Sequence, residues 1–147
     1  MIYLASDHAG FELKEKLQIF LGELGFDAED LGNLTHEEGD DYPDFIFLAA
    51  KKVAEDPENN KAIILGGSGQ GEAMAANRLK GVRAAVFYGG PLDIIKLSRE
   101  HNDANILSLG AKFILENEAR EAVKMWLETS FSDGERHKRR IGKIDEI

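Results

Sequence analysis

Short apolar segments alternate with amphipathic segments along the whole of this chain. We expect strands at residues 2–6, 27–30, 62–65, 83–88 and 106–109. Helical periodicity covers residues 11–24, 44–54, 72–79, 92–100 and 116–128. Strand–helix alternation at this spacing favours a parallel sheet with helices on both faces. The pattern therefore predicts a three-layer α/β/α sandwich with a five-stranded parallel sheet, and an extra C-terminal helix over residues 135–145.

The chain of 147 residues has the size of one domain and can bury a core. No repeat or linker divides it, so we expect a single domain over residues 1–147. In the first helix, Lys14 and Lys16 are expected to lie off an apolar stripe formed by Leu13, Leu17, Phe20, Leu21 and Leu24. No strand follows the last helix, which could pack on a second subunit.

Composition and charge exclude several classes of protein. A hydrophobic content of 43% is too high for a disordered chain, and no apolar run approaches the length of a membrane span. The chain has no cysteine, which excludes disulfides and thiol catalysis. The net charge of −9 argues against nucleic acid or an acidic membrane as the main partner. A cytoplasmic location is the expectation that fits best.

A glycine-rich segment, Gly66-Gly67-Ser68-Gly69-Gln70-Gly71-Glu72, directly follows the third predicted strand. A buried strand that ends in glycines and continues into a helix brings backbone N–H groups close to a bound anion. Gly66 and Gly71 have the spacing of a nucleotide-binding P-loop, but Glu72 stands where a lysine would neutralise a triphosphate. A carboxylate there repels polyphosphate and can accept a proton from a molecule bound in the loop.

Neither a dinucleotide nor a metal is expected as a cofactor. The dinucleotide fingerprint belongs after the first strand, where this chain offers only Gly10. The strand after the glycine-rich segment ends without an acidic residue that could hold a ribose. His36 and His137 lack the spacing of metal ligands.

Ligands of parallel sheets bind at the carboxyl ends of the strands, where the strand order reverses. The first strand ends in residues 6–10, the third in the glycine-rich segment and the fifth in residues 110–112. The helix before the fifth strand ends in residues 99–103. We expect all four segments to lie at the same edge of the sheet.

Two candidates at this edge also have structural interpretations. Asp7 could cap the helix that follows it, and His101 could place a cation at a helix C-terminus. Asp7 can cap the helix and also act on a bound molecule, and we favour a functional role for it. With His8 and Glu72 expected nearby, we favour for His101 a neutral imidazole that exchanges a proton with a hydroxyl.

Basic residues crowd the end of this acidic chain. They could form a solvated helix or a small anion site. Arg136 and Arg140 lie one helical turn apart, where they could clamp a phosphate or pair with neighbouring carboxylates such as Glu135.

Taken together, the motifs resemble the ribose-5-phosphate isomerase B family, which also contains the galactose-6-phosphate isomerase subunits. The resemblance spans nearly the whole chain. It rests on Ser6-Asp7-His8-Ala9-Gly10, Asp41-Tyr42-Pro43, Gly67-Ser68-Gly69-Gln70-Gly71, Ala75-Ala76-Asn77, Gly81-Val82-Arg83-Ala84, Arg99-Glu100-His101-Asn102-Asp103 and Arg136-His137.

The resemblance implies a Rossmann-like fold and a metal-independent aldose–ketose isomerase of phosphorylated sugars that works through an enediolate. It implies a homodimer, or a tetramer, whose active sites are shared between subunits. His101 would open the sugar ring, and Asp7 would move protons between the first two oxygens. Ser68 and the amides of Gly67, Gly69 and Gly71 would hold the enediolate oxygen.

The same resemblance implies that His8, Arg136 and Arg140 bind phosphate, with the histidine and the arginines coming from different subunits. The remaining implied substrate contacts are Tyr42, Asn77, Asn102 and Lys112.

The chain departs from the family pattern at two positions. Many members have a cysteine base where this chain has Gly66, but one subgroup uses a glutamate in the context matched by Gly69-Gln70-Gly71-Glu72. Glu72 is therefore the expected base, with a pKa raised by burial beside the substrate. Lys112 replaces a common arginine, which keeps the charge and loses the planar fork.

The leading hypothesis is an isomerase of ribose 5-phosphate and ribulose 5-phosphate. One alternative is a six-carbon substrate such as galactose 6-phosphate or allose 6-phosphate. Others are a non-catalytic phosphate- or nucleotide-binding module and a structural subunit that needs a partner for catalysis.

Overall fold

Five parallel strands form a single open sheet in the computed structural model, which describes all 147 residues. The strands are β1 (Ile2–Ser6), β2 (Ala28–Asp30), β3 (Lys61–Gly66), β4 (Ala84–Phe87) and β5 (Ile106–Gly110). Their order across the sheet is β2-β1-β3-β5-β4. All pairs are parallel, so the carboxyl ends of the strands share one edge.

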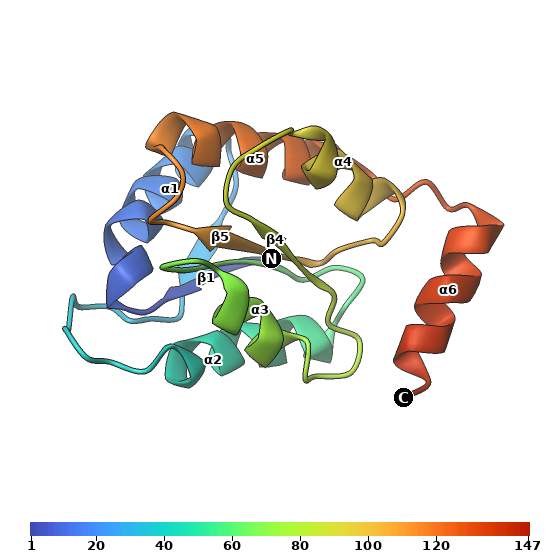
Figure 1. Cartoon of the computed structure of the whole chain (residues 1–147), viewed down its shortest axis with the longest axis horizontal. Helices are drawn as coiled ribbons and strands as arrows, with labels where there is room; N and C mark the ends of the chain where they lie inside the picture. The colour runs from blue at the N-terminus through green and yellow to red at the C-terminus, as the bar shows by residue number, and fades with distance from the viewer.

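Helices cover both faces of this sheet (Figure 1). They are the short 3-10 helix η1 (His8–Gly10), α1 (Phe11–Glu23), α2 (Tyr42–Glu55), α3 (Gln70–Ala76), α4 (Asp93–Glu100), α5 (Glu116–Glu128) and α6 (Glu135–Asp145). The first, fourth and fifth α-helices lie on one face, and α2 and α3 lie on the other. The predicted three-layer α/β/α sandwich with its extra C-terminal helix is confirmed.

The central strand β3 is buried on both faces. Ile63 and Leu65 join the core under α1 and α5, whereas Ala62 and Ile64 join the core under α2. A strand of a parallel sheet that is covered on both sides reads as a continuous apolar run, which is why this segment is so plain in the sequence. Its carboxyl end, where the glycine-rich segment starts, is therefore firmly placed.

The first helix differs from the prediction at Lys14. This side chain is fully buried rather than off the packed stripe, because its ammonium group pairs with Asp30 and donates to the Asn33 carbonyl at 2.9 Å. Lys16 is exposed, as expected. Lys14 thus ties α1 to the loop that follows β2.

The final helix, α6, stands apart from the layers (Figure 1). It has no buried residue, and it contacts the body through an Arg83–Asp145 ion pair of 3.8 Å. None of the helices is both long and apolar enough to cross a bilayer.

Candidate active site

The chain reverses its direction of travel across the sheet between β1 and β3, and this is where the candidate site lies. Ser6 pairs with Leu65, so Asp7 emerges beside Gly66. Gly10 makes this close approach possible, because a β-carbon there would lie 2.6 Å from the Leu65 β-carbon. The sequence predicted this meeting of residues 6–10 with the glycine-rich segment.

Hydrogen bonds from β5 and from the residues that follow it fix the glycine-rich loop in place. Gly69 has a φ of +78°, and its carbonyl accepts a 2.7 Å hydrogen bond from the Ser108 hydroxyl. The carbonyls of Gly66 and Gly67 accept from the amides that follow β5, at 2.8 and 3.0 Å. The N–H groups of residues 67–69 have no acceptor in the chain. They form a ready-made site for a negatively charged oxygen.

Glu72 lies in the first turn of α3 and is only 4% exposed. Its carboxylate lies over Gly66, so that a β-carbon on Gly66 would overlap it. Burial raises the pKa of Glu72; its own backbone N–H opposes the rise, and the charge of Asp7 adds to it. The structure therefore places an acid with a raised pKa beside the loop amides, as expected for a general base.

Asp7 occupies the junction between β1 and the 3-10 helix. It is 7% exposed, and its carboxylate accepts a 3.0 Å hydrogen bond from the Ala9 amide. The capping role considered from the sequence is therefore real. The second carboxylate oxygen lies 4.0 Å from the His8 ring Nδ1, and the charge of Asp7 reaches Glu72, whose pKa it raises.

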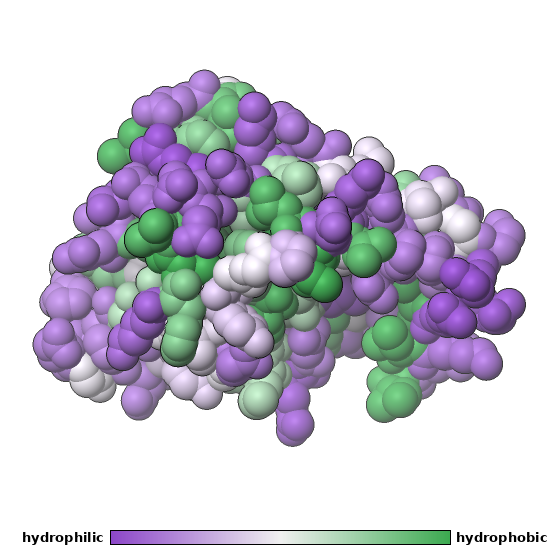
Figure 2. Space-filling model, turned by 45° about the horizontal axis from the view of Figure 1, so that its top comes forward, coloured by the Kyte–Doolittle hydropathy of each residue, from purple (hydrophilic) through white to green (hydrophobic).

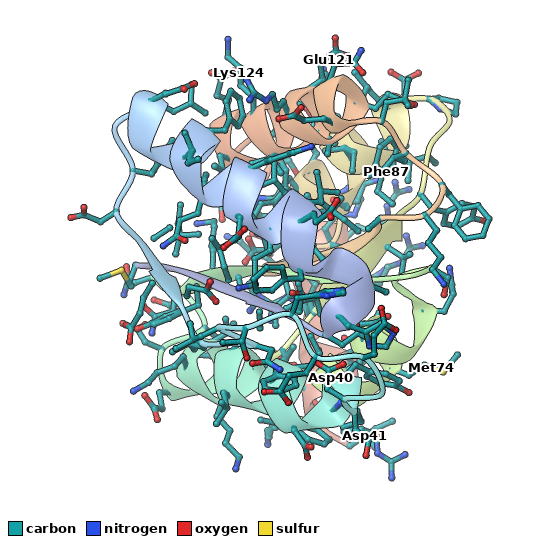
Figure 3. The ribbon with its side chains drawn as sticks, turned by 90° about the vertical axis from the view of Figure 1, so that its left-hand side faces the viewer. Asp40, Asp41, Met74, Phe87, Glu121 and Lys124 are labelled. Carbon is teal, nitrogen blue, oxygen red and sulfur yellow. The ribbon has the colours of Figure 1, made fainter.

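His8 has a partner that the sequence did not suggest. Its ring Nδ1 lies 2.6 Å from an Asp40 carboxylate oxygen, which also accepts from the His8 amide at 3.0 Å. The hydrogen bond to Asp40 is the main reason why the pKa of His8 is raised. Figure 3 views the molecule from this side, and Asp40 lies there between the starts of α1 and α2.

Asp7, His8 and Asp40 are the only group in the chain with the proximity of metal ligands, their donor atoms lying within 4.8 Å of one another. The 2.6 Å contact between the ring nitrogen and Asp40 is that of a hydrogen bond. A charge-assisted hydrogen bond accounts for the cluster without an ion.

Three further predicted residues lie in or against the loop. The Tyr42 hydroxyl lies against Gly71, 2.5 Å from where a β-carbon would be, so a larger residue there would displace the Tyr42 ring. The stem of Lys112 lies over Gly67. Ser68 accepts a 3.3 Å hydrogen bond from the Gln70 amide.

The remaining predicted residues do not lie at this edge. The expectation that residues 99–103 join the site is wrong, because α4 runs back against β4 and ends where β5 begins. His101 and Asn102 therefore lie at the amino edge of the sheet. Asn77 lies at the far end of α3, where its amide both donates to and accepts from the Ala84 backbone.

A second cluster forms at the amino edge between α4 and α6. The rings of His101 and His137 stack with centroids 4.3 Å apart. Burial lowers the pKa of His137, and the charges of His101, Arg136 and Arg140 lower it further. The two arginines of the C-terminal helix thus accompany His101, on the opposite side of the molecule from Glu72.

None of the five cavities of the single chain is lined by Asp7 or Glu72. One of them, of about 440 Å³, lies at the amino edge beside Phe26 and Lys61. Asn77 and Asn102 line another, of about 340 Å³, beside Ile144. Asp7 and Glu72 are instead buried at the carboxyl edge, outside every cavity of the single chain.

A doubly wound sheet with a buried carboxylate at the start of a loop of unpaired amides is an arrangement that can move protons next to an oxygen-bearing carbon, as sugar isomerases do. The chain matches the model of the Ribose/Galactose Isomerase family over residues 2–144, and it belongs to this family. The resemblance drawn from the sequence motifs is confirmed.

Curated relatives and solved structures of the family are similar to this chain over nearly its full length. Ribose-5-phosphate isomerase B of Mycolicibacterium paratuberculosis is 39% identical over 145 residues, which cover 99% of this chain and 89% of that protein. The structure of ribose-5-phosphate isomerase B from Mycoplasma genitalium with bound ribulose-5-phosphate matches with a TM-score of 0.94 at 39% identity, covering 99% of this chain and 93% of the other. The enzyme from Thermotoga maritima matches with a TM-score of 0.91 at 42% identity, covering 99% and 97%.

Proposed function

We propose that this chain is an aldose–ketose isomerase that interconverts ribose 5-phosphate and ribulose 5-phosphate. Family membership and the match to a structure holding ribulose-5-phosphate support this reaction. The observation that carries it is the Glu72 carboxylate, which is buried over Gly66 and beside the free loop amides.

In this proposal, Glu72 removes the proton from C2 of the open-chain aldose. The electron pair of the C–H bond forms the C1–C2 double bond, and the carbonyl oxygen O1 becomes the enediolate oxygen. The amides of residues 67–69, with Ser68, stabilise that charge. Asp7 transfers the O2 proton to O1, and Glu72 returns its proton to C1 to give the ketose.

The two clusters at opposite edges of the sheet suggest a homodimer. His8, Tyr42 and Lys112 would contact the substrate from one subunit. His101 of the partner subunit would open the sugar ring, with Asn102 beside it, while Arg136 and Arg140 of the partner subunit would hold the phosphate. Two guanidinium groups on one helix face repel each other unless an anion lies between them, which fits such a role.

An apolar surface supports this assembly. The strand β4 is the last of the sheet, and its outer edge is unpaired. Hydrophobic side chains are exposed on the segments around it, among them Tyr88, Ile94 and Leu97. Figure 2 shows such side chains gathered on this face, with a second group at the end of α6. A two-fold axis here sets the strands of two copies antiparallel, so the carboxyl edge of one meets the amino edge of the other.

Isomerase activity of the purified chain in the presence of EDTA tests the proposal. In D₂O, the ribulose 5-phosphate formed from ribose 5-phosphate should carry solvent deuterium at C1, and the aldose re-formed from it should carry deuterium at C2, since the base exchanges its proton with solvent. Faster conversion of galactose 6-phosphate or allose 6-phosphate would indicate the six-carbon activity instead. Absence of turnover and exchange with every sugar phosphate would point to a binding module.

A further inference from the structure

We propose that Asp40 is a positioning residue that holds His8 as a cation and leaves its ring Nε2 free for the substrate phosphate. This proposal rests on the proposed function and concerns the phosphate end of the same site. Its starting point is the pair of hydrogen bonds that join His8 to Asp40, a residue in a loop without any periodic pattern.

Both oxygens of the Asp40 carboxylate are engaged, and the side chain is only 5% exposed. One oxygen accepts from the backbone amide and the ring Nδ1 of His8, at 3.0 and 2.6 Å. The other accepts from the Asn33 side-chain amide at 3.1 Å. Burial is the largest single effect and opposes ionisation, but the hydrogen bonds from His8 and Asn33, with the charge of His8, together outweigh it and lower the pKa of Asp40. The carboxylate is therefore charged and fixed in orientation.

The support continues into the body of the protein. The backbone N–H of Asn33 donates a hydrogen bond to the Ser6 carbonyl at 2.6 Å, which holds this loop against the end of β1. Its carbonyl accepts from the buried Lys14 ammonium group at 2.9 Å. Asp40 is thus joined to the first strand and the first helix rather than to a free loop. This is the support that a precisely oriented binding group requires.

The charges around His8 all favour its protonated form. Asp40 has the largest effect, and the carboxylates of Asp7 and Glu38 add smaller ones. The ring of His36 lies 6.4 Å away, and Lys14 on α1 is neutralised by Asp30. Burial acts in the opposite direction without overcoming these groups, so the pKa of His8 is raised.

A phosphate requires a donor at Nε2. With Nδ1 bonded to Asp40, a protonated ring donates from Nε2, and a charge-assisted hydrogen bond to phosphate is roughly twice as strong as a neutral one. The His8–Asp40 pair itself is close to neutral. The net positive charge must therefore come from the arginines, while Asp40 determines the direction and the protonation of the donor.

The first test is a proton NMR titration of the imidazoles in the whole enzyme. The chain has 4 histidines, and a His8→Gln variant assigns the signal of His8. In the native enzyme, His8 should titrate above the ordinary value of about 6.5, and inorganic phosphate should raise its pKa further. In Asp40→Asn, the signal should titrate at or below that value, and in Asp40→Glu the pKa should partly recover. A native His8 with an ordinary pKa overturns the proposal even if no variant folds.

The second test measures the ratio of KM in Asp40→Asn to KM in the native enzyme across pH. The ratio cancels the titration of the substrate phosphate itself. It should be largest, about tenfold, at pH values where only the native His8 is still charged, and should approach one at lower pH, where His8 is protonated in both proteins. The kcat should change little, because the phosphate is remote from the reacting carbons. A ratio that does not vary with pH contradicts the role of Asp40.

Asp44→Asn is the matched control, since Asp44 is exposed and makes no side-chain hydrogen bond. The two tests also separate this proposal from the proposed function. If the chain had no isomerase activity, the NMR titration with inorganic phosphate would still support or contradict the role of Asp40, because it requires no turnover.

Discussion

Gly66 and Glu72 occupy the same small volume at the end of β3. A methyl group on Gly66 would overlap the Glu72 carboxylate, so this position has to be glycine as long as Glu72 folds over it. In Gly66→Ala the carboxylate must move away from the loop amides. We expect kcat to fall by about 10²-fold, since a displacement of about 1 Å can have that effect.

Gly22→Ala provides the control for this variant. A β-carbon on Gly22 meets nothing within 4 Å, and the residue lies inside α1. We expect it to keep full activity and to gain about 0.5–1 kcal/mol of stability. Steady-state kinetics and circular dichroism compare the two proteins. Equal kcat values would argue against Glu72 as the reacting group.

Replacing Glu72 by glutamine removes the proposed base and keeps its shape. We expect kcat to fall by roughly 10²–10⁴-fold with little change in substrate affinity. Because the pKa of Glu72 is raised, native activity should decline with falling pH above the range of an ordinary carboxyl group, as the base becomes protonated. An exposed Glu121→Gln variant serves as control, and near-native turnover of the Glu72 variant excludes the assignment.

At the residue scale, the sequence predicted the groups that stand next to glycines and strand ends. Asp7 and Glu72 could be found because both directly follow a recognisable strand or loop. Asp40 and Lys14 could not, since each depends on a long-range partner: Asp40 binds His8 across 32 positions, and Lys14 binds Asp30 across 16. No local pattern encodes such pairs.

At the scale of elements, the strands and helices lie close to where the periodicity placed them. The largest difference is α3, which ends at Ala76 rather than near Leu79. The Asn77 side chain bonds to the Ala84 backbone, and the next amides make short i→i−3 bonds that tighten the chain into a turn. A side chain that bonds to the backbone of another element ends the helix, and that partner is hidden in the sequence.

The contact between α1 and the end of β2 allows a stability prediction. Lys14→Met should destabilise the fold by about 3–5 kcal/mol, because it leaves the carboxylate of Asp30 without its buried partner. Lys16→Met on the exposed face of the same helix should change stability by less than about 0.5 kcal/mol. Urea unfolding midpoints measure both. A similar midpoint for the two variants would mean that the buried pair adds no stability.

At the scale of the whole molecule, the position of His101 differs most from the prediction, and the difference has a physical reason. His101 was expected beside Glu72, but a helix between parallel strands returns its chain to the amino edge. The residues implied by the family therefore divide into two groups on opposite sides of one chain. The sequence contains both groups, and only the topology shows that one copy cannot join them.

This division makes subunit sharing testable by mixing two inactive homodimers, Glu72→Gln and His101→Asn. Random exchange of subunits makes about half of the dimers mixed, and each mixed dimer has one doubly altered site and one fully native site, so about one quarter of native activity should return. If each site came from a single chain, every site would keep one lesion and no activity would return. The matched control mixes Glu72→Gln with Asp7→Asn, whose altered residues lie at the same edge. There each site of a mixed dimer carries one lesion, and the mixture should stay inactive.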